Sequence, residues 1–118
     1  MNKEMLHNLG RIPDGLSYDG DIVSLDEDDE VKKLTEWGIE EAWYWYSYQY
    51  YEGMGQILLR RGDKFDIHDM GHCSCYGPLE HYTGFTERFS CLDDIEKSCT
   101  DGAYREIAPL VEMAKNGT

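Results

Sequence analysis

Residues 71–78, GHCSCYGP, contain the side chains of this chain that are best suited to chemistry. Two thiols, Cys73 and Cys75, flank a serine, and His72 precedes them. Thiolate and imidazole are the ligands that zinc selects, so Cys73 and Cys75 with His72 or His81 form a candidate zinc site. Against this interpretation, paired cysteines in zinc knuckles usually lie two residues apart, whereas Cys-Ser-Cys has a single intervening residue. A small zinc-stabilised domain, with its site at residues 72–81, is therefore our alternative prediction.

A catalytic thiol in the same segment is less well supported. Cys73 adjoins His72, but neighbouring side chains of an extended segment diverge, so adjacency does not create a catalytic dyad. The simplest interpretation is structural: Gly71, Gly77 and Pro78 shape a turn, and the small Cys and Ser side chains pack where a bulky residue would not fit. We therefore predict no catalytic residues and no enzymatic activity, with zinc as the one cofactor under consideration.

Negative charge is the second feature of the sequence. The chain of 118 residues has a formal net charge of −13, and residues 19–41 contain ten acidic residues against two lysines, a net charge of −8. A domain this acidic repels nucleic acid and anionic membranes. It is attracted to basic protein surfaces, including those that normally hold DNA or RNA.

The hydropathy pattern predicts a cytoplasmic protein. No apolar run approaches the length of a membrane span, and the first residues lack the apolar stretch of a secretory signal. In a reducing compartment the four cysteines are expected to be free thiols: Cys73, Cys75, Cys91 and Cys99.

The order of the expected elements indicates a single α+β domain spanning residues 1–118. We expect an antiparallel sheet of three or four strands with helices packed on one face. The expected segments are an irregular lead-in at 1–21, an acidic helix at 24–37, a β-meander at 43–70 and C-terminal helices at 91–115.

Finer features can be predicted for the helices and the meander. In the acidic helix, Val31 and Leu34 should face the core, and Glu30, Lys33 and Glu36 should stay outside. Pro109 should kink or break the last helix. The meander is expected to contain strands at 43–51, 56–61 and 64–70, with a turn at 52–55.

The run WYWYSYQYY, residues 43–51, predicts a strand with aromatic residues on both faces. Successive side chains of a strand point to opposite faces, so Trp43 and Trp45 lie on one face and an unbroken row of tyrosines on the other. Only one face has to join the core, so we expect either the tryptophans or the tyrosine row to stay partly exposed. The alternative is that helices, or a second copy of the chain in a homodimer, cover both faces.

The register of the second hairpin depends on its loop. A two-residue loop at 62–63 would pair Leu59 with Asp66 and mix polar with apolar residues on one face. A three-residue loop places Leu59 on the same face as Phe65 and Ile67. Because register follows the buried face, the longer loop is favoured.

One block of the chain resembles known proteins. The motif Tyr51-Glu52-Gly53-x-Gly55, followed by the hairpin and by GHCSCYGP, is similar to a block in small, mostly uncharacterised phage and bacterial proteins. The similarity covers about residues 43–80. It implies a phage or mobile-element setting inside a host cell, and it assigns no chemistry. Small acidic phage proteins are often inhibitors of host defence enzymes, such as anti-restriction and anti-CRISPR proteins that imitate DNA.

Charge, aromatic content and resemblance together predict a non-catalytic acidic interaction protein. It would inhibit a host nucleic-acid-handling or defence protein by binding that protein's basic surface. The acids would steer the encounter, and exposed aromatic rings would anchor the complex. The predicted partner-binding residues are Asp26, Glu27, Asp28, Asp29, Glu30, Glu36, Tyr44, Tyr46, Tyr48 and Tyr50.

Overall fold

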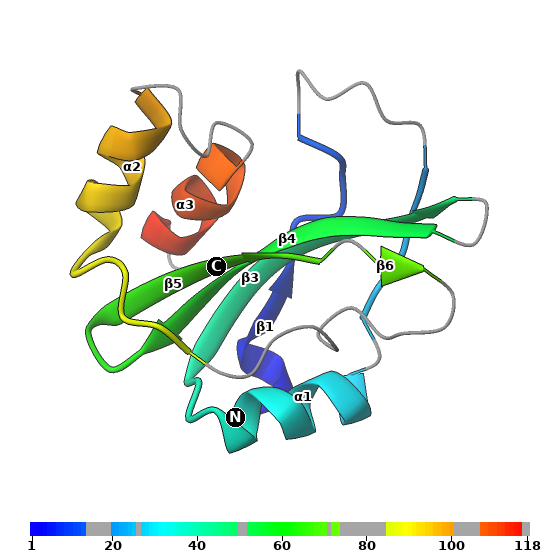
Figure 1. Cartoon of the computed structure of the whole chain (residues 1–118), viewed down its shortest axis with the longest axis horizontal. Helices are drawn as coiled ribbons and strands as arrows, with labels where there is room; N and C mark the ends of the chain where they lie inside the picture. Colours follow the sequence, from blue (N-terminus) through cyan, green and yellow to red (C-terminus); the bar gives the residue numbers. More distant parts are fainter. Residues whose placement is uncertain are drawn as a thin grey trace.

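The chain forms a mixed β-sheet with three α-helices in the part that the structure describes (Figure 1). This computed structural model describes residues 1–13, 20–25, 27–49, 52–70, 72–73, 85–100 and 107–116. The main path through the sheet has the order β1 (Leu6–Asn8), β3 (Glu41–Gln49), β4 (Glu52–Arg61) and β5 (Lys64–Asp69). Two short strands extend it: β2 (Asp21–Ile22) pairs with β3, and β6 (His72–Cys73) pairs with β4. The β3–β4 and β4–β5 pairs are antiparallel and β1 is parallel to β3, so the predicted α+β class is confirmed.

The β3–β4 ladder is the centre of the sheet. It pairs nine residues of each strand, from Glu41 opposite Arg60 to Gln49 opposite Glu52. The turn predicted at 52–55 is therefore wrong, because these residues belong to β4. A Cβ atom at Gly55 would collide with the carbonyl oxygen of Trp45, so this glycine permits a close approach of two strands. Glycine at this position permits tight strand pairing and does not mark a turn.

Both faces of the sheet are buried, and the two faces of β3 belong to different hydrophobic clusters. We call them the tyrosine-side cluster and the tryptophan-side cluster after their β3 residues. The tyrosine-side cluster includes Leu25, Leu34, Ile39, Ala42, Tyr44, Tyr46, Ile57, Leu59 and Met70. The tryptophan-side cluster includes Trp43, Trp45, Leu58, Phe65, Ile67, Ile95, Ile107, Leu110 and Val111. The predicted alternation of residues 43–46 between two faces is thus confirmed.

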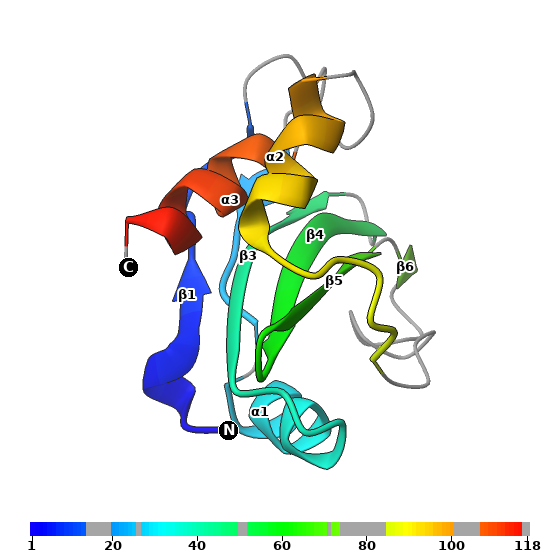
Figure 2. The same cartoon turned by 90° about the vertical axis from the view of Figure 1, so that its left-hand side faces the viewer.

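Helices contribute to both clusters. The helices α2 (Leu92–Thr100) and α3 (Ala108–Lys115) contribute Ile95 and Leu110 to the tryptophan-side cluster, while α1 (Glu27–Glu36) contributes Leu34 to the tyrosine-side cluster. The expectation that helices would pack on one face only is therefore corrected. In Figures 1 and 2, α1 lies at one end of the molecule, and α2 and α3 lie together at the other.

The helix boundaries follow from their end residues. After α1, Gly38 adopts a φ of +74°, and the N–H groups of Gly38 and Ile39 donate to the carbonyls of Thr35 and Leu34. A left-handed glycine is the usual way to end a helix. Pro109 lies in the first turn of α3, where its missing N–H costs no helical hydrogen bond. The predicted break at Pro109 is therefore a helix start at Ala108.

The β4–β5 hairpin has the register that we disfavoured. Leu59 pairs with Asp66, Arg60 with Phe65 and Arg61 with Lys64, so the loop has two residues. Gly62, the first loop residue, has a φ of +63°, as a tight hairpin turn requires. Asp66 therefore shares a face with Leu59, and it tolerates this buried position because its carboxylate is hydrogen-bonded, as described below.

The lead-in predicted at 1–21 contains regular structure. Residues Lys3–Met5 form a 3₁₀ helix, β1 follows it, and Asp21 begins β2. The N–H of Leu9 continues the β1–β3 pairing by donating to the carbonyl of Tyr44 at 2.7 Å. A three-residue strand with two polar side chains has no hydrophobic period to detect, so this element was missed.

Candidate interaction surface

The acidic helix α1 presents part of its predicted charge to solvent. Asp28, Asp29 and Glu36 are exposed, whereas Glu30 is buried, at 6% exposure. Glu30 lies one helical turn before the core residue Leu34, so it shares the inward face of the helix. The expectation that Glu30 would stay outside is therefore wrong. Asp26 and the side chain of Glu27, also predicted to bind a partner, lie outside the described residues.

The rest of α1 is held firmly against the sheet. Leu34 is completely buried, and Trp37, just beyond the helix, packs against the tyrosine-side cluster. The carbonyl of Trp37 accepts a hydrogen bond from Arg61 at 3.4 Å, and the amino group of Met1 donates to the hydroxyl of Thr35. The exposed acids of α1 are thus presented from a helix anchored on its other side.

The tyrosine row is a core element. Tyr44 and Tyr46 are 2% and 5% exposed, and the N–H of Leu25 donates to the hydroxyl of Tyr44 at 3.3 Å. The tryptophans of the opposite face, Trp43 and Trp45, are equally buried. The expectation of an exposed aromatic face is therefore corrected for these residues, because helices and loops cover both sides of β3.

The far end of the tyrosine row is less buried than Tyr44 and Tyr46 where the structure describes it. Tyr48 is half-buried and pairs in register with Gly53 of β4. Tyr50, the last predicted member, lies outside the described residues. The aromatic row therefore supplies at most its far end to a partner.

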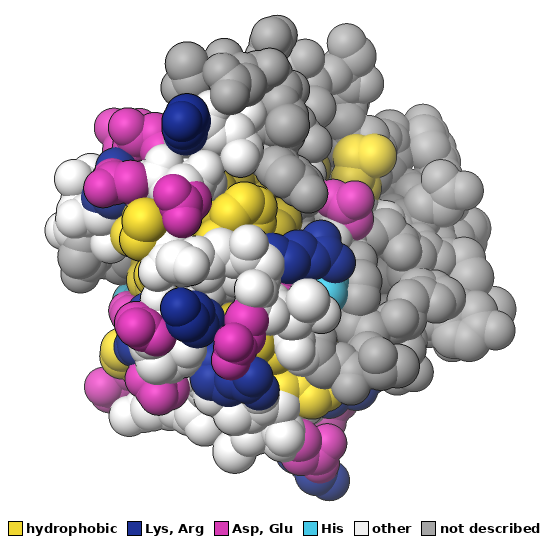
Figure 3. All heavy atoms as spheres, turned by 60° about the vertical axis from the view of Figure 1, so that its left-hand side comes forward, with side chains coloured by type: hydrophobic (Ala, Val, Ile, Leu, Met, Phe, Trp, Pro, Cys, Tyr) yellow, Lys and Arg dark blue, Asp and Glu magenta, His cyan; other side chains and the backbone are white. Residues whose placement is uncertain are grey.

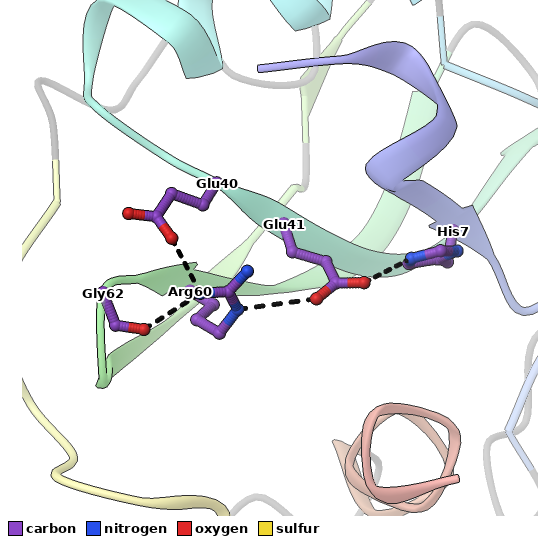
Figure 4. Close-up of polar contacts among 5 residues, drawn as sticks. All are labelled: His7, Glu40, Glu41, Arg60 and Gly62. Carbon is purple, nitrogen blue, oxygen red and sulfur yellow. Dashed lines mark hydrogen bonds and ion pairs between the residues drawn. The ribbon is translucent and has the colours of Figure 1, made fainter. Parts of the chain in front are cut away.

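A polar network crosses three strands on the tryptophan side of the sheet (Figure 4). Glu41 of β3 contacts both neighbouring strands: its Oε2 lies 2.8 Å from Nε2 of His7 on β1, and its Oε1 forms an ion pair with Nε of Arg60 on β4 at 3.4 Å. Arg60 also donates to Glu40 at 2.8 Å and to the carbonyl of Gly62 at 3.0 Å. The network fastens β1 to the central ladder. The sequence carried no signal for it, because His7 was assigned to the lead-in.

The His7 ring adds an apolar contact to this network. It stacks on Trp43 with 5.8 Å between ring centroids and an interplanar angle of 23°. The same imidazole therefore joins β1 to β3 through a polar edge and an apolar face.

A second polar cluster surrounds Asp66, which is fully buried. Its Oδ1 accepts from the N–H of Ile67 at 2.9 Å and lies 3.1 Å from Nε of Arg88. Its Oδ2 accepts from the N–H of Thr86 at 2.8 Å and lies 3.1 Å from Nε2 of His68. Burial acts to raise the pKa of Asp66, but the hydrogen bonds from His68, Thr86 and Ile67 outweigh it and hold that pKa below its usual value.

Contacts of this cluster attach residues 86–89 to β5. These residues follow the cysteine corner, the name that we give to residues 71–78 (GHCSCYGP). Phe89 exchanges two backbone hydrogen bonds with Phe65 of β5, at 2.9 and 3.1 Å, and Arg88 donates to the carbonyl of Ile67 at 3.4 Å. Together with the Thr86 bond to Asp66, these contacts fasten residues 86–89 along the outer edge of β5. Among the described residues of this segment, Phe89 forms one isolated bridge with Phe65.

Several basic side chains in the described part of the fold pair with carboxylates of the same chain: Arg60, Arg61, Arg88 and Lys115. Arg61 pairs with Glu87 at 3.4 Å and lies over the ring of Phe85 at 4.5 Å. On the face in Figure 3, Lys and Arg side chains lie directly beside Asp and Glu side chains. These cations are held by acids close to them, while the chain as a whole keeps a net charge of −13.

The ion pair between α2 and α3 is the tightest of these contacts. Nζ of Lys115 lies 2.7 Å from Asp93 and 2.6 Å from Glu96. Hydrogen bonds to both carboxylates raise the pKa of Lys115 above its usual value, and the lysine in turn lowers the pKa of Asp93.

The cysteine corner is described only in part. The backbone of His72 and Cys73 forms β6 opposite Gly53 and Glu52, while their side chains, and all of Cys75 and His81, lie outside the described residues. The zinc site therefore stays a prediction. Cys91 is exposed and Cys99 half-buried, both as free thiols. Within the described ranges, no three His, Cys, Asp or Glu side chains are grouped as a metal ion requires.

Two further observations complete the description. None of the helices in the described part of the chain combines the length and the apolar character needed to cross a membrane. Comparison of the chain with models of protein families, with curated proteins and with solved structures finds no match.

Proposed function

We propose that this chain is a non-catalytic acidic interaction protein that binds the basic, nucleic-acid-binding surface of a host protein. The observation that supports this function best is the pair of exposed acids, Asp28 and Asp29, in the first turn of α1, in a chain with a net charge of −13. Opposite potentials accelerate encounter and orient the partners before short-range contacts form.

The position of α1 favours it as the contact element. It lies at the end of the molecule away from α2 and α3 (Figures 1 and 2), so a partner can approach it without meeting the ion-paired helices. Leu34 and the Gly38 helix end fix α1 on the sheet, so little freedom is lost when its outer face is bound. The proposed contact residues are Asp28, Asp29 and Glu36.

The consequence for the partner follows from its own function. A surface that binds DNA or RNA is basic, and an acidic protein seated on it excludes the nucleic acid by charge and by volume. The resemblance of residues 43–80 to a block in phage and bacterial proteins supports a host defence or nucleic-acid-handling protein as the target. We therefore propose inhibition by competition as the biological effect.

The test begins with immobilised protein and a lysate of the native host, from which retained proteins are identified. The association rate of the purified partner is then measured at low and high salt. We expect it to fall by about tenfold or more with added salt, because screening removes the steering. Unlabelled DNA should compete with the chain for the partner.

A matched pair of double variants separates the α1 surface from bulk charge. Asp28→Asn with Asp29→Asn should slow association, while Asp63→Asn with Asp94→Asn removes the same charge from exposed positions outside α1 and should have a smaller effect. Equal association rates at both salt concentrations would refute electrostatic steering. Equal effects of the two double variants would refute α1 as the contact element.

A further inference from the structure

A groove of about 270 Å³ separates α2 from α3. It is lined by Glu96 and Cys99 of α2, by Ala108, Val111, Glu112 and Lys115 of α3, and by Asn116. Its apolar floor is formed by Cys99, Ala108 and Val111; Val111 is 2% exposed and belongs to the tryptophan-side cluster. The floor is therefore continuous with the core, and the groove is a fixed feature of the way in which the two helices pack.

The rim of the groove is acidic on both helices. Glu96 and Glu112 are exposed at the surface, and Glu112 makes no ion pair with any described residue. Among the described residues that line the groove, Lys115 is the only cation. Its Nζ already forms ion pairs with Asp93 and Glu96. An apolar floor beneath carboxylates is complementary to a side chain with an aliphatic stem and a cationic end.

We propose that the α2–α3 groove binds one long basic side chain, arginine or lysine, of a protein partner. The stem of that side chain lies along Val111 and Ala108, and its cationic end pairs with Glu112. This inference deepens the proposed function and rests on it in one respect: the occupant belongs to a cationic protein. It adds a second, short-range contact at the opposite end of the molecule from α1.

The size of the groove favours a single side chain over a small-molecule cofactor. Sites for drug-sized ligands and cofactors usually enclose roughly 300–1,000 Å³. The groove lies below that range, so an extended side chain entering from a partner's surface fits it better. Lys115 shows that the same helix pair already holds an aliphatic ammonium group between two carboxylates.

Butylguanidinium, which reproduces the end of an arginine side chain, is the probe for this site. Amide chemical shifts of the ¹⁵N-labelled chain are recorded while butylguanidinium, pentanol or guanidinium is added at constant ionic strength. We expect saturable shifts at Cys99, Val111 and Glu112 with butylguanidinium, with a dissociation constant on the order of millimolar for so small a ligand. Pentanol, which has the stem alone, and guanidinium, which has the charge alone, should each bind at least threefold more weakly.

Three variants make the test specific. Glu112→Gln should weaken butylguanidinium binding by about threefold or more, whereas Glu4→Gln, an identical change at an exposed residue outside the groove, should leave it unchanged. Ala108→Leu fills the groove from an exposed position, so the chain should fold and the shifts should disappear. Equal binding of pentanol, or an unchanged affinity in Glu112→Gln, would overturn the proposal.

The two proposals fail separately. If butylguanidinium shifts the groove residues but partner association does not depend on salt or on Asp28 and Asp29, the groove stands and the α1 contact is wrong. If association depends on the α1 acids but butylguanidinium shifts spread over the whole surface without saturation, the groove is wrong and the acidic interaction protein stands.

Discussion

Replacing Asp66 by asparagine would remove a charge and one acceptor from a buried carboxylate that holds four donors. An amide at this position keeps the shape of the side chain, but its NH₂ group cannot accept a hydrogen bond. If the NH₂ group took the place of Oδ1, it would face the N–H of Ile67 and the guanidinium of Arg88, and both are obligate donors. In the place of Oδ2 it would face the N–H of Thr86 and His68, and a neutral histidine can change tautomer and accept.

The second orientation is therefore favoured, and its cost can be worked out. The N–H of Thr86 loses its acceptor at a part-buried position, which costs about 1–3 kcal/mol. The bond to Arg88 loses the negative charge that strengthens it, which costs about 1 kcal/mol more. We expect Asp66→Asn to lower the free energy of unfolding by about 2–4 kcal/mol.

Urea denaturation followed by tryptophan fluorescence measures this loss, and amide hydrogen exchange at Thr86 locates it. Asp63→Asn, the same change at an exposed loop position, is the control and should stay within about 0.5 kcal/mol of the parent chain. A loss below about 1 kcal/mol for Asp66→Asn, with unchanged exchange at Thr86, would refute the reasoning. The carboxylate would then contribute no more than a neutral amide.

The pH dependence follows from the same contacts. Because the pKa of Asp66 in the folded chain lies below its unfolded value, the ionised carboxylate stabilises the fold fully above an unfolded pKa of about 3.9. This stabilisation is lost as the pH falls from there through the folded pKa. The stability advantage of the parent chain over Asp66→Asn should therefore shrink as the pH falls below about 4, as urea titrations at several pH values would measure.

Three further substitutions test the packing of the sheet and of α1. Gly55→Ala should destabilise the fold by about 3 kcal/mol, because the added methyl meets the carbonyl oxygen of Trp45. Thermal unfolding measures this loss of stability. An unchanged stability would contradict the tight approach of β3 and β4. Tyr44→Phe should cost about 1–2 kcal/mol in urea denaturation, because the buried N–H of Leu25 loses its acceptor, and a more stable variant would exclude that bond. Gly38→Ala should lower the free energy of unfolding by about 1 kcal/mol, because an alanine is strained at a φ of +74°. The helix signal in circular dichroism should fall as well. An unchanged helix signal would show that the end of α1 does not depend on this glycine.

The main elements of the fold could be predicted because their patterns are local. The run of β-forming aromatics at 43–51 and its alternation determine β3 and the two faces to which its residues point. Helices were likewise expected within 91–115, and α2 and α3 both lie in that range. These features depend on residues a few positions apart, which is the information that a single sequence contains.

The errors concern contacts between distant residues. We rejected the true register of the β4–β5 hairpin because it buries Asp66, and nothing near Asp66 in the sequence shows that Thr86 and Arg88 will satisfy its carboxylate. The strand β1 was missed because its partner β3 lies more than thirty residues away. The exposure expected for Tyr44 failed for the same reason, since only the assembled fold shows that both faces of β3 are covered.

The negative charge of the candidate surface could be predicted from the sequence, but not which of its acidic side chains would be buried. The exposed acids Asp28, Asp29 and Glu36 were identified correctly as surface residues, while Glu30 turned inward because it shares the face of Leu34. The groove between α2 and α3 had no signal in the sequence, because it arises only when the two helices pack against each other.

The two hydrophobic clusters on opposite faces of β3 have a consequence for how substitutions combine. Side chains such as Tyr44 and Trp45 are neighbours along the chain, yet they pack into separate clusters and communicate only through the backbone between them. Energetic losses from changes on the two sides should therefore sum almost independently, whereas changes within one side should couple strongly. The sheet therefore separates the two clusters, and the residues of one cluster can be redesigned while those of the other are left unchanged.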